Sequence, residues 1–359
     1  MSPTPPGELD RLTRAVARLL GTTPAALTDA FRPAGAAELA EVRRMRVPVI
    51  GDELTWDDDR YLRWRYPDPH PGAPESRLWC LTHGGRVLAA CGTERFALRL
   101  PDRTLDAWHI LDLVVDPALQ RIGLGAWVML MVFARCPLAL ALGASEMARS
   151  MSERLFVPLP DRHVWRLPLR TSVQLSRKLP APAAQVTGAV ADAALALVRR
   201  ARAVAGHVRI VALEQPPDDV ERLANTLAAD DVVSSRRTSA SWRWRFADNP
   251  RSLYRFWAAE RDGRVVAYLT TRARGGSIHL VDWVWDATLP WEPVARPALA
   301  ALWARAIAAH AGPSMNGSIH ASTYDARSDE LCRALLLRRR EERRPHLLRS
   351  ADPGLVPLL

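Results

Sequence analysis

At positions 113–126 the chain reads Leu113-Val114-Val115-Asp116-Pro117-Ala118-Leu119-Gln120-Arg121-Ile122-Gly123-Leu124-Gly125-Ala126. An apolar strand ends at Asp116-Pro117, because proline cannot donate a hydrogen bond to a neighbouring strand. Gly123 and Gly125 let the bare backbone approach a ligand and adopt φ values that other residues avoid. The helix expected to follow has unpaired N–H groups at the positive end of its dipole. The segment therefore predicts a strand, turn and helix that can bind a pyrophosphate.

Two common nucleotide-binding motifs do not fit this turn. A Walker loop needs Gly-Lys followed by Ser or Thr, and a dinucleotide fingerprint needs a third small residue where this chain has Val128. The pattern that fits is Gln-x-x-Gly-x-Gly, from Gln120 to Gly125. With the strand and Asp-Pro before it, this pattern closely resembles the acyl-CoA-binding motif of the GNAT superfamily of N-acetyltransferases. A glycine-tightened turn without a ligand is the alternative interpretation.

The resemblance implies that the backbone makes most of the cofactor contacts. Leu113 and Val115 would pair with the pantetheine arm and hold the thioester carbonyl. The amides of residues 121–126 would hold the pyrophosphate, with Gln120 at the entrance. The implied cofactor-binding residues are Leu113, Val114, Val115, Gln120, Arg121, Ile122, Gly123, Leu124, Gly125 and Ala126. The implied co-substrate is acetyl-CoA or another acyl-CoA, and no metal is expected.

Three motifs occur twice in the same order along the chain. They are Arg63-Trp64-Arg65-Tyr66 with Arg243-Trp244-Arg245-Phe246, Gly85-Arg86-Val87 with Gly263-Arg264-Val265, and residues 109–116 with residues 279–286. Their offsets of 180, 178 and 170 residues are too long for a solenoid unit. The chain is therefore predicted to contain two copies of one domain.

The expected fold is α+β, with two tandem GNAT-like domains that each contain a mixed, mostly antiparallel sheet flanked by helices. The expected ranges are 1–23 for an N-terminal helical extension, 24–178 for a GNAT domain with an intact turn, 179–204 for a Pro/Ala-rich linker and connecting helix, 205–350 for a degenerate GNAT-like domain, and 351–359 for a tail. Strands at 164–169 and near 345–349 are expected to close the first and second domains.

The second copy departs from the motif after Trp285-Asp286. It continues Ala287-Thr288-Leu289-Pro290-Trp291-Glu292-Pro293, with bulky residues where the glycines should be. Its backbone is therefore not expected to wrap around a pyrophosphate in the same way. This copy could shape the acceptor pocket or simply stabilise the first domain.

Acyl transfer to an amine needs a base, a polarised carbonyl and a proton for the leaving thiolate. Asp112 and His109 lie on the strand that leads into the turn, and Glu94 on the neighbouring strand is a third candidate base. Strand alternation predicts that His109 and Asp112 point to opposite faces of the sheet. Both recur in the second copy, as His279 and Asp282, so a hydrogen-bonded structural role is the alternative for each.

The proton donor is harder to identify. Many GNAT enzymes carry a Tyr on the helix after the parallel strand, whereas the corresponding predicted helix, 147–156, contains none. Ser152 is the candidate donor, and an exposed helix serine is the alternative interpretation. The missing Tyr makes a domain that binds acyl-CoA without turnover a rival hypothesis.

Composition adds expectations about partners. The 359 residues carry a net charge of +10, but Lys178 is the only lysine, so the arginine excess reflects a GC-rich genome and nucleic-acid binding is not expected. The four cysteines, Cys80, Cys91, Cys136 and Cys332, lack metal-site spacing and are expected to be reduced and mostly buried. The most apolar stretch, 189–198, is shorter than the ~20 residues of a membrane span. A cytoplasmic protein without a membrane partner is expected.

These patterns predict an acyltransferase that moves an acetyl or other acyl group from acyl-CoA to an amine on a small molecule or peptide. The first alternative is a tandem-GNAT aminoacyl transferase that uses aminoacyl-tRNA, although such enzymes generally lack the intact turn. The second is a non-catalytic module that senses CoA or binds a partner. The acceptor and the oligomeric state do not follow from the sequence.

Overall fold

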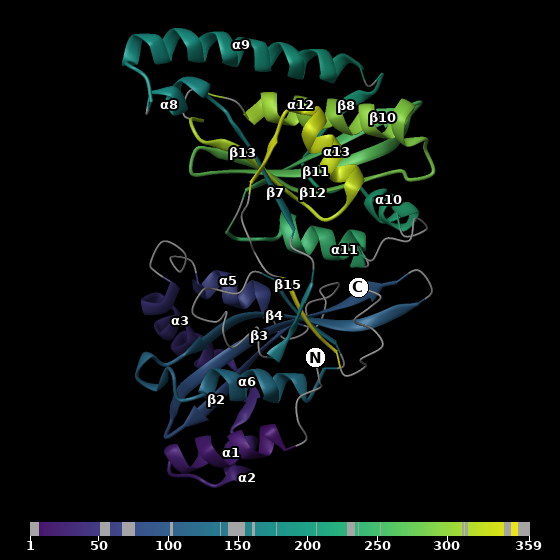
Figure 1. Cartoon of the computed structure of the whole chain (residues 1–359). Coiled ribbons are helices and arrows are strands. Elements are labelled where there is room, and N and C mark those ends of the chain that lie inside the picture. Colours follow the sequence, from purple (N-terminus) through teal and green to yellow (C-terminus); the bar gives the residue numbers. More distant parts are fainter. Residues whose placement is uncertain are drawn as a thin grey trace. The chain divides into compact units, whose positions relative to one another are not determined.

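The computed structural model describes residues 7–50, 58–66, 76–100, 103–136, 138–142, 155–159, 162–176, 178–205, 207–227, 234–235, 237–251, 253–310, 312, 315–340 and 346–350. The chain forms two compact units (Figure 1). The first contains Met1–Pro160, Asn249–Arg251 and Arg344–Leu359, and the second contains Asp161–Asp248 and Ser252–Arg343. Each unit is built around one mixed sheet with helices, which confirms the predicted α+β class.

Along the main path of its strands, from β1 to β6, the sheet of the first unit is antiparallel except at one pair. Its order is β1 (Phe31–Pro33), β2 (Ser76–His83), β3 (Arg86–Arg99), β4 (Thr104–Val115), β5 (Leu138–Leu142), β15 (His346–Ser350) and β6 (Val157–Leu159). β4 and β5 are parallel, as expected for the strands on either side of the helix that follows the glycine turn. The strand that leads into the glycine turn thus lies at the centre of the sheet.

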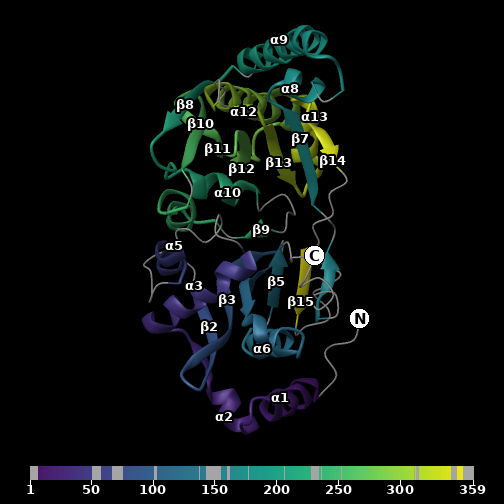
Figure 2. The same ribbon diagram turned by 90° about the vertical axis from the view of Figure 1, so that its left-hand side faces the viewer.

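Helices cover both faces of this sheet (Figure 2). A first core joins the sheet to α1 (Glu8–Leu19), α2 (Pro24–Asp29) and α6 (Leu124–Phe133), and the short η1 (Pro117–Leu119) packs beside it. A second core joins the other face to α3 (Ala36–Ile50) and α5 (Asp58–Arg65). α6 is buried because nearly all its residues are apolar, and Trp127 in α6 donates a hydrogen bond to Thr13 Oγ1 in α1 (3.0 Å).

The second unit repeats this plan. Its sheet has the order β14 (Arg338–Arg340), β7 (His163–Pro168), β13 (Ser318–Thr323), β12 (Ser277–Trp285), β11 (Arg264–Arg274), β10 (Tyr254–Arg261) and β8 (Arg209–Leu213). The remaining elements are α8 (Thr171–Leu175), α9 (Ala181–Ala205), α10 (Val220–Leu227), β9 (Ser234–Ser235), α11 (Ser239–Trp242), η2 (Arg243–Ala247), η3 (Trp291–Ala295), α12 (Arg296–His310) and α13 (Ala326–Ala334). β12 and β13 are the parallel pair, corresponding to β4 and β5.

Matching side-chain contacts confirm the internal repeat. Trp79 in β2 donates from Nε1 to Thr93 Oγ1 in β3 (3.2 Å). Trp257 in β10 donates in the same way to Thr271 Oγ1 in β11 (2.9 Å). Both pairs are buried and lie 178 residues apart in the sequence. The two sheets therefore share register as well as strand order.

The strands that close the two sheets are exchanged. The strand expected at 164–169 to complete the first domain is β7, which pairs with β13 and β14 of the second sheet. The strand expected near 345–349 to complete the second domain is β15, which pairs with β5 and β6 of the first sheet. The units therefore differ from the expected continuous ranges 24–178 and 205–350. Either strand can satisfy the open backbone groups of either edge, so its own sequence does not specify the sheet it joins.

The connecting helix is longer than the apolar stretch in the sequence. α9 extends over Ala181–Ala205 and contacts α8 and α12 of its own unit. Its segment Ala181–Arg202 is long and apolar enough to cross a membrane. Length and composition alone are weak evidence for a membrane span, because core helices of soluble proteins pass the same test.

The exchange predicts where a core mutation acts. Leu348 in β15 is fully buried, so Leu348→Ala should lower the free energy of unfolding by about 2–5 kcal/mol. Because β15 lies between β5 and β6, the lost protection should appear in residues 138–142 and 157–159. Hydrogen exchange with mass spectrometry on the full chain measures this.

The matched control is Leu167→Ala in β7, where Leu167 is also buried. That variant should increase exchange in β13 and β14 of the second sheet. Faster exchange in β13 after Leu348→Ala would show that β15 does not belong to the first sheet.

Candidate active site

The glycine turn leaves backbone N–H groups free at the start of α6. Arg121 and Gly123 both have positive φ, +70° and +87°, and Gly123 is the N-cap residue. The first intrahelical hydrogen bond runs from Trp127 N to Gly123 O (3.0 Å). The amides of residues 124–126 therefore precede the helical hydrogen-bond pattern and point out of the helix start. With the helix dipole, they form a site that favours an anion.

Two physical features favour glycine at position 123. Its positive φ is unfavourable for residues with a Cβ. An added Cβ would also lie 3.3 Å from Leu12 Cδ1 of α1. The exposed Arg121 beside it supplies a positive charge at the same turn.

Among the described residues, the end of β4 next to this turn has no partner strand on the side that faces away from β3. Within the described residues, β4 pairs with β5 only from Trp108 to Ile110. Asp116 N donates to Leu88 O of β3 (2.9 Å), so the backbone groups of the preceding Val115 point away from β3. The Val115 carbonyl accepts a hydrogen bond from Gln120 Nε2 (3.4 Å). The end of β4 therefore offers backbone groups to an extended ligand on the side that faces away from β3.

β4 also contains a β-bulge at Asp112. The register shifts between Ala90 and Gly92, so β4 has one residue more than β3 at this point. Asp112 has a φ of +51°, a conformation that Asp tolerates better than most residues. The bulge makes the alternation prediction wrong: Asp112 contacts α3 and α5 on one face of the sheet, and His109, the cross-strand partner of Glu94, lies on the same face.

Buried polar side chains fix the Asp112 carboxylate. Arg46 Nη1 donates to Oδ1 (2.8 Å), and the hydroxyls of Tyr66 (2.6 Å) and Tyr61 (3.4 Å) donate to Oδ2. Burial raises the pKa of Asp112, but Arg46, Arg65 and the Tyr66 hydrogen bond together lower it by more, and the net shift is downward. The carboxylate is therefore held ionised, and its oxygens are occupied.

Glu94 and His109 lie beside this cluster. Glu94 is 1% exposed and forms an ion pair with Arg65 Nη2 (2.6 Å). It lies directly opposite His109 in the β3–β4 register, so the two side chains are neighbours on one face. The structure thus brings three of the four predicted catalytic residues to the face covered by α3 and α5. Ser152, the fourth, lies outside the described residues.

The second copy keeps the turn after its β4 counterpart but not the anion site. Asp286 accepts from Thr288 N (3.1 Å), as Asp116 accepts from Ala118 N (2.9 Å). Beyond it, η3 (Trp291–Ala295) forms in place of the glycine turn, with Pro290 as its N-cap. The predicted degeneration of this copy is therefore visible in its backbone.

The polar cluster is also missing from the second copy. Tyr66 corresponds to Phe246, and Glu94 corresponds to Arg272, which lies opposite His279. Burial, with Arg272 and His320 next in effect, lowers the pKa of His279 to about 4, so this histidine is neutral at pH 7. Asp282 pairs with Arg237 instead (3.1 Å), and burial raises the pKa of its carboxyl.

Sequence reasoning missed Arg46, Tyr61 and Tyr66. Tyr66 carried a signal, because it is the one position at which the repeated Arg-Trp-Arg-aromatic motif differs between the copies. No sequence pattern indicated Arg46 or Tyr61, because they lie 66 and 51 residues away from Asp112 in the sequence.

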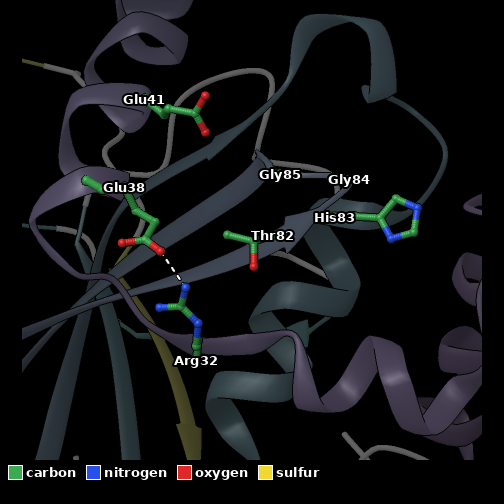
Figure 3. A pocket seen from close by; sticks show the side chains of 8 residues that line it. Arg32, Glu38, Glu41, Thr82, His83, Gly84 and Gly85 are labelled. Carbon is green, nitrogen blue, oxygen red and sulfur yellow. Dashed lines mark hydrogen bonds and ion pairs between the residues drawn. The ribbon is translucent and has the colours of Figure 1, made fainter.

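A hollow of about 460 Å³ lies elsewhere on the first unit (Figure 3). It is lined by α3, β1 and the turn between β2 and β3, with Arg32, Ala37, Glu38, Glu41, Thr82, His83, Gly84 and Gly85. Glu38 is paired with Arg32, and Glu41 accepts from Val87 N (2.7 Å). None of the predicted site residues lines this hollow.

The four cysteines are buried, reduced thiols, as predicted. Across the described ranges, no three His, Cys, Asp or Glu side chains gather as a metal site would require.

Searches against family models and curated proteins found no match. Solved structures do match. The chain is similar to a GCN5-related N-acetyltransferase from Kribbella flavida, with 15% identity, a TM-score of 0.56, and coverage of 90% of this chain and 71% of the other. A GCN5-related N-acetyltransferase from Anabaena variabilis gives 11% identity and a TM-score of 0.59, with coverage of 90% and 72%.

A third similar structure has two such domains in one chain. It is a tandem GNAT protein from the clavulanic acid biosynthesis pathway, with 14% identity, a TM-score of 0.52, and coverage of 90% of this chain and 98% of the other. At these identities the comparisons establish the fold. The chain contains the GNAT fold twice, and only its first copy has the glycine turn of the acyl-CoA motif.

Proposed function

We propose that the protein is an acyl-CoA-dependent N-acyltransferase whose first unit is active. The observation that carries this proposal is the continuity between two sets of backbone groups. They are the amides at the start of α6, which precede the helical hydrogen bonds, and the end of β4, which has no partner strand among the described residues on the side that faces away from β3. The diphosphate of acyl-CoA would bind the amides at the start of α6. Its extended pantetheine chain, which contains amide groups, would bind the end of β4. The comparison with structures titled N-acetyltransferases favours acetyl-CoA as the donor.

The residues present fit this co-substrate. The amides of residues 124–126 and the Arg121 side chain would hold the diphosphate, and the Val115 backbone would hold a pantetheine amide. Bound acyl-CoA would supply an activated acyl carbonyl with a thiolate leaving group. The bulge at Asp112 would orient the β4 backbone toward that carbonyl. Asp112 is thus a positioning residue, because its carboxylate is already ionised and bonded to Arg46 and Tyr66.

His109 is proposed as the base that takes the amine proton, and Glu94 as the carboxylate that positions it. Imidazole is the side-chain type best suited to accept a proton near neutral pH. The second copy supports the pairing by contrast: it lacks the glycine turn, and Arg272 replaces the carboxylate opposite His279. The acceptor amine, on a small molecule or peptide, would approach from the face covered by α3 and α5.

Gly125→Glu places a negative charge and a side chain at the anion site. We expect acetyl-CoA affinity to fall at least 100-fold, measured by calorimetry. The matched control is Pro290→Glu, which adds the same charge to the exposed turn of the second copy and should leave the affinity unchanged. No binding by the wild-type chain would refute the proposal. Binding without thiol release across a broad amine panel would assign a sensor role instead.

Removing the proposed base should affect chemistry but not binding. His109→Gln and Glu94→Gln should each lower kcat by about 10²- to 10⁴-fold, with the acetyl-CoA Kd within twofold of wild type. His279→Gln in the second copy is the control and should keep full activity. The rate is measured from the release of the CoA thiol, which is detected by its reaction with a chromogenic disulfide. Wild-type turnover by His109→Gln would rule out His109 as the base.

Asp112→Asn removes the negative charge that is paired with Arg46, whose side chain is 2% exposed. We expect a loss of about 3–5 kcal/mol in the free energy of unfolding at pH 7. Because the folded state lowers the pKa of Asp112 below its ordinary 3.8, its contribution is present above pH 4 and lost as pH falls through the folded value. Urea unfolding from pH 7 to pH 3 should therefore show a difference between wild type and variant that shrinks in acid. A constant difference would contradict the assigned ion pair.

A further inference from the structure

One face of α9 is fixed against its own unit. Gly188 lies so close to α8 that an added Cβ would be 2.3 Å from Ser172 Cα. Asp192 accepts a hydrogen bond from Thr171 N (2.7 Å), and Ala184 is 1% exposed. Figures 1 and 2 show α9 lying along α8 and α12. The orientation of the helix about its own axis is therefore set.

The opposite face of α9 is apolar and exposed. Val186, Val190, Leu197 and Val204 are 68%, 67%, 69% and 73% exposed. With Ala193 and Arg200 they form a row that we call the outer seam: Val186, Val190, Ala193, Leu197, Arg200 and Val204. Its steps alternate between four and three residues, the period of 3.5 that marks the contact seam of a coiled coil. A solvent-facing helix gains nothing from this spacing, whereas a partner helix requires it.

We infer that the outer seam pairs with the outer seam of a second copy of this chain, in an antiparallel two-helix contact. Identical surfaces related by a twofold axis are the commonest basis of homo-oligomers. Arg200 decides the orientation, because a parallel pair would place the two Arg200 side chains against each other. With full antiparallel overlap, each Arg200 lies opposite Val190 of the other chain, and the two charges are about 15 Å apart along the helix.

The size of the surface predicts a weak dimer. A helix of 25 residues is about 37 Å long and about 10 Å wide, so the pair falls in the small class of interfaces, below about 1,200 Å².

A membrane surface is a less suitable partner for the outer seam than a second copy of the chain. The outer seam has no Trp or Phe, which interfacial helices use to enter the headgroup region. Crossing a bilayer would also expose Asp192 and separate Gly188 from α8.

Sedimentation of the full chain over a range of concentrations tests the pairing. Wild type should show a reversible monomer–dimer equilibrium in the micromolar range. Val190→Glu with Leu197→Glu should weaken it at least tenfold. Thr187→Glu with Ala196→Glu adds the same charge at exposed positions outside the seam and should not change it. A wild-type monomer at all concentrations would overturn the inference. A membrane-binding result would also overturn it. In that case the wild-type chain would float with anionic vesicles, the Val190→Glu/Leu197→Glu variant would not, and both would have the same mass in sedimentation.

Two cysteine variants test the orientation, since all four native cysteines are buried. In the antiparallel overlap, residue 186 of one chain faces residue 204 of the other, while like positions are about 27 Å apart. Under mild oxidation, Val186→Cys and Val204→Cys should therefore form disulfide-linked dimers only when mixed. Efficient cross-linking of each variant alone would show a parallel pair and overturn the proposed orientation.

Discussion

The ion pair between Arg46 and Asp112 is the constraint on which the proposed active site depends. It joins α3 to the last part of β4 and holds Asp112 at a positive φ within a bulge. The bulge gives β4 one more residue than β3, and beyond it the described residues show no further pairing with β5. The place of Asp112 on the face covered by α3 and α5 follows from this irregularity. A regular strand would place Asp112 on the face opposite to that of His109.

The two copies show how one framework serves two purposes. Both keep the Trp–Thr pair between neighbouring strands and the Asp-capped turn after the central strand, which are requirements of the sheet itself. Where the first copy has Tyr66 and Glu94, the second has Phe246 and Arg272. Phe246 belongs to a core cluster of aromatic rings with Trp242 and Tyr268. The second copy thus uses for packing the region that the first uses for a charged cluster.

Local sequence signals predicted most of the fold. The glycine turn, the repeat and nearly every central strand follow from spacing and composition, because these features depend on neighbouring residues. The bulge at Asp112 could not be predicted, since it arises from the register between β3 and β4, and alternation alone placed Asp112 on the wrong face. The partners Arg46 and Tyr61 are remote in sequence. The exchange of β7 and β15 was missed for a similar reason: a strand can pair with any edge that has open hydrogen-bonding groups, and the partners of both strands are remote in sequence.

That exchange also sets the order in which the protein can mature. β15 is synthesised about 190 residues after β6, its neighbour in the first sheet, so at about 5–20 residues per second the interval is roughly 10–40 s. During this time the outer edges of β5 and β6 lack the strand that separates them. The second sheet receives β7 before the rest of its strands are made. The unit that is synthesised first is therefore completed last, and the proposed site can take its final form only after the second unit has been translated.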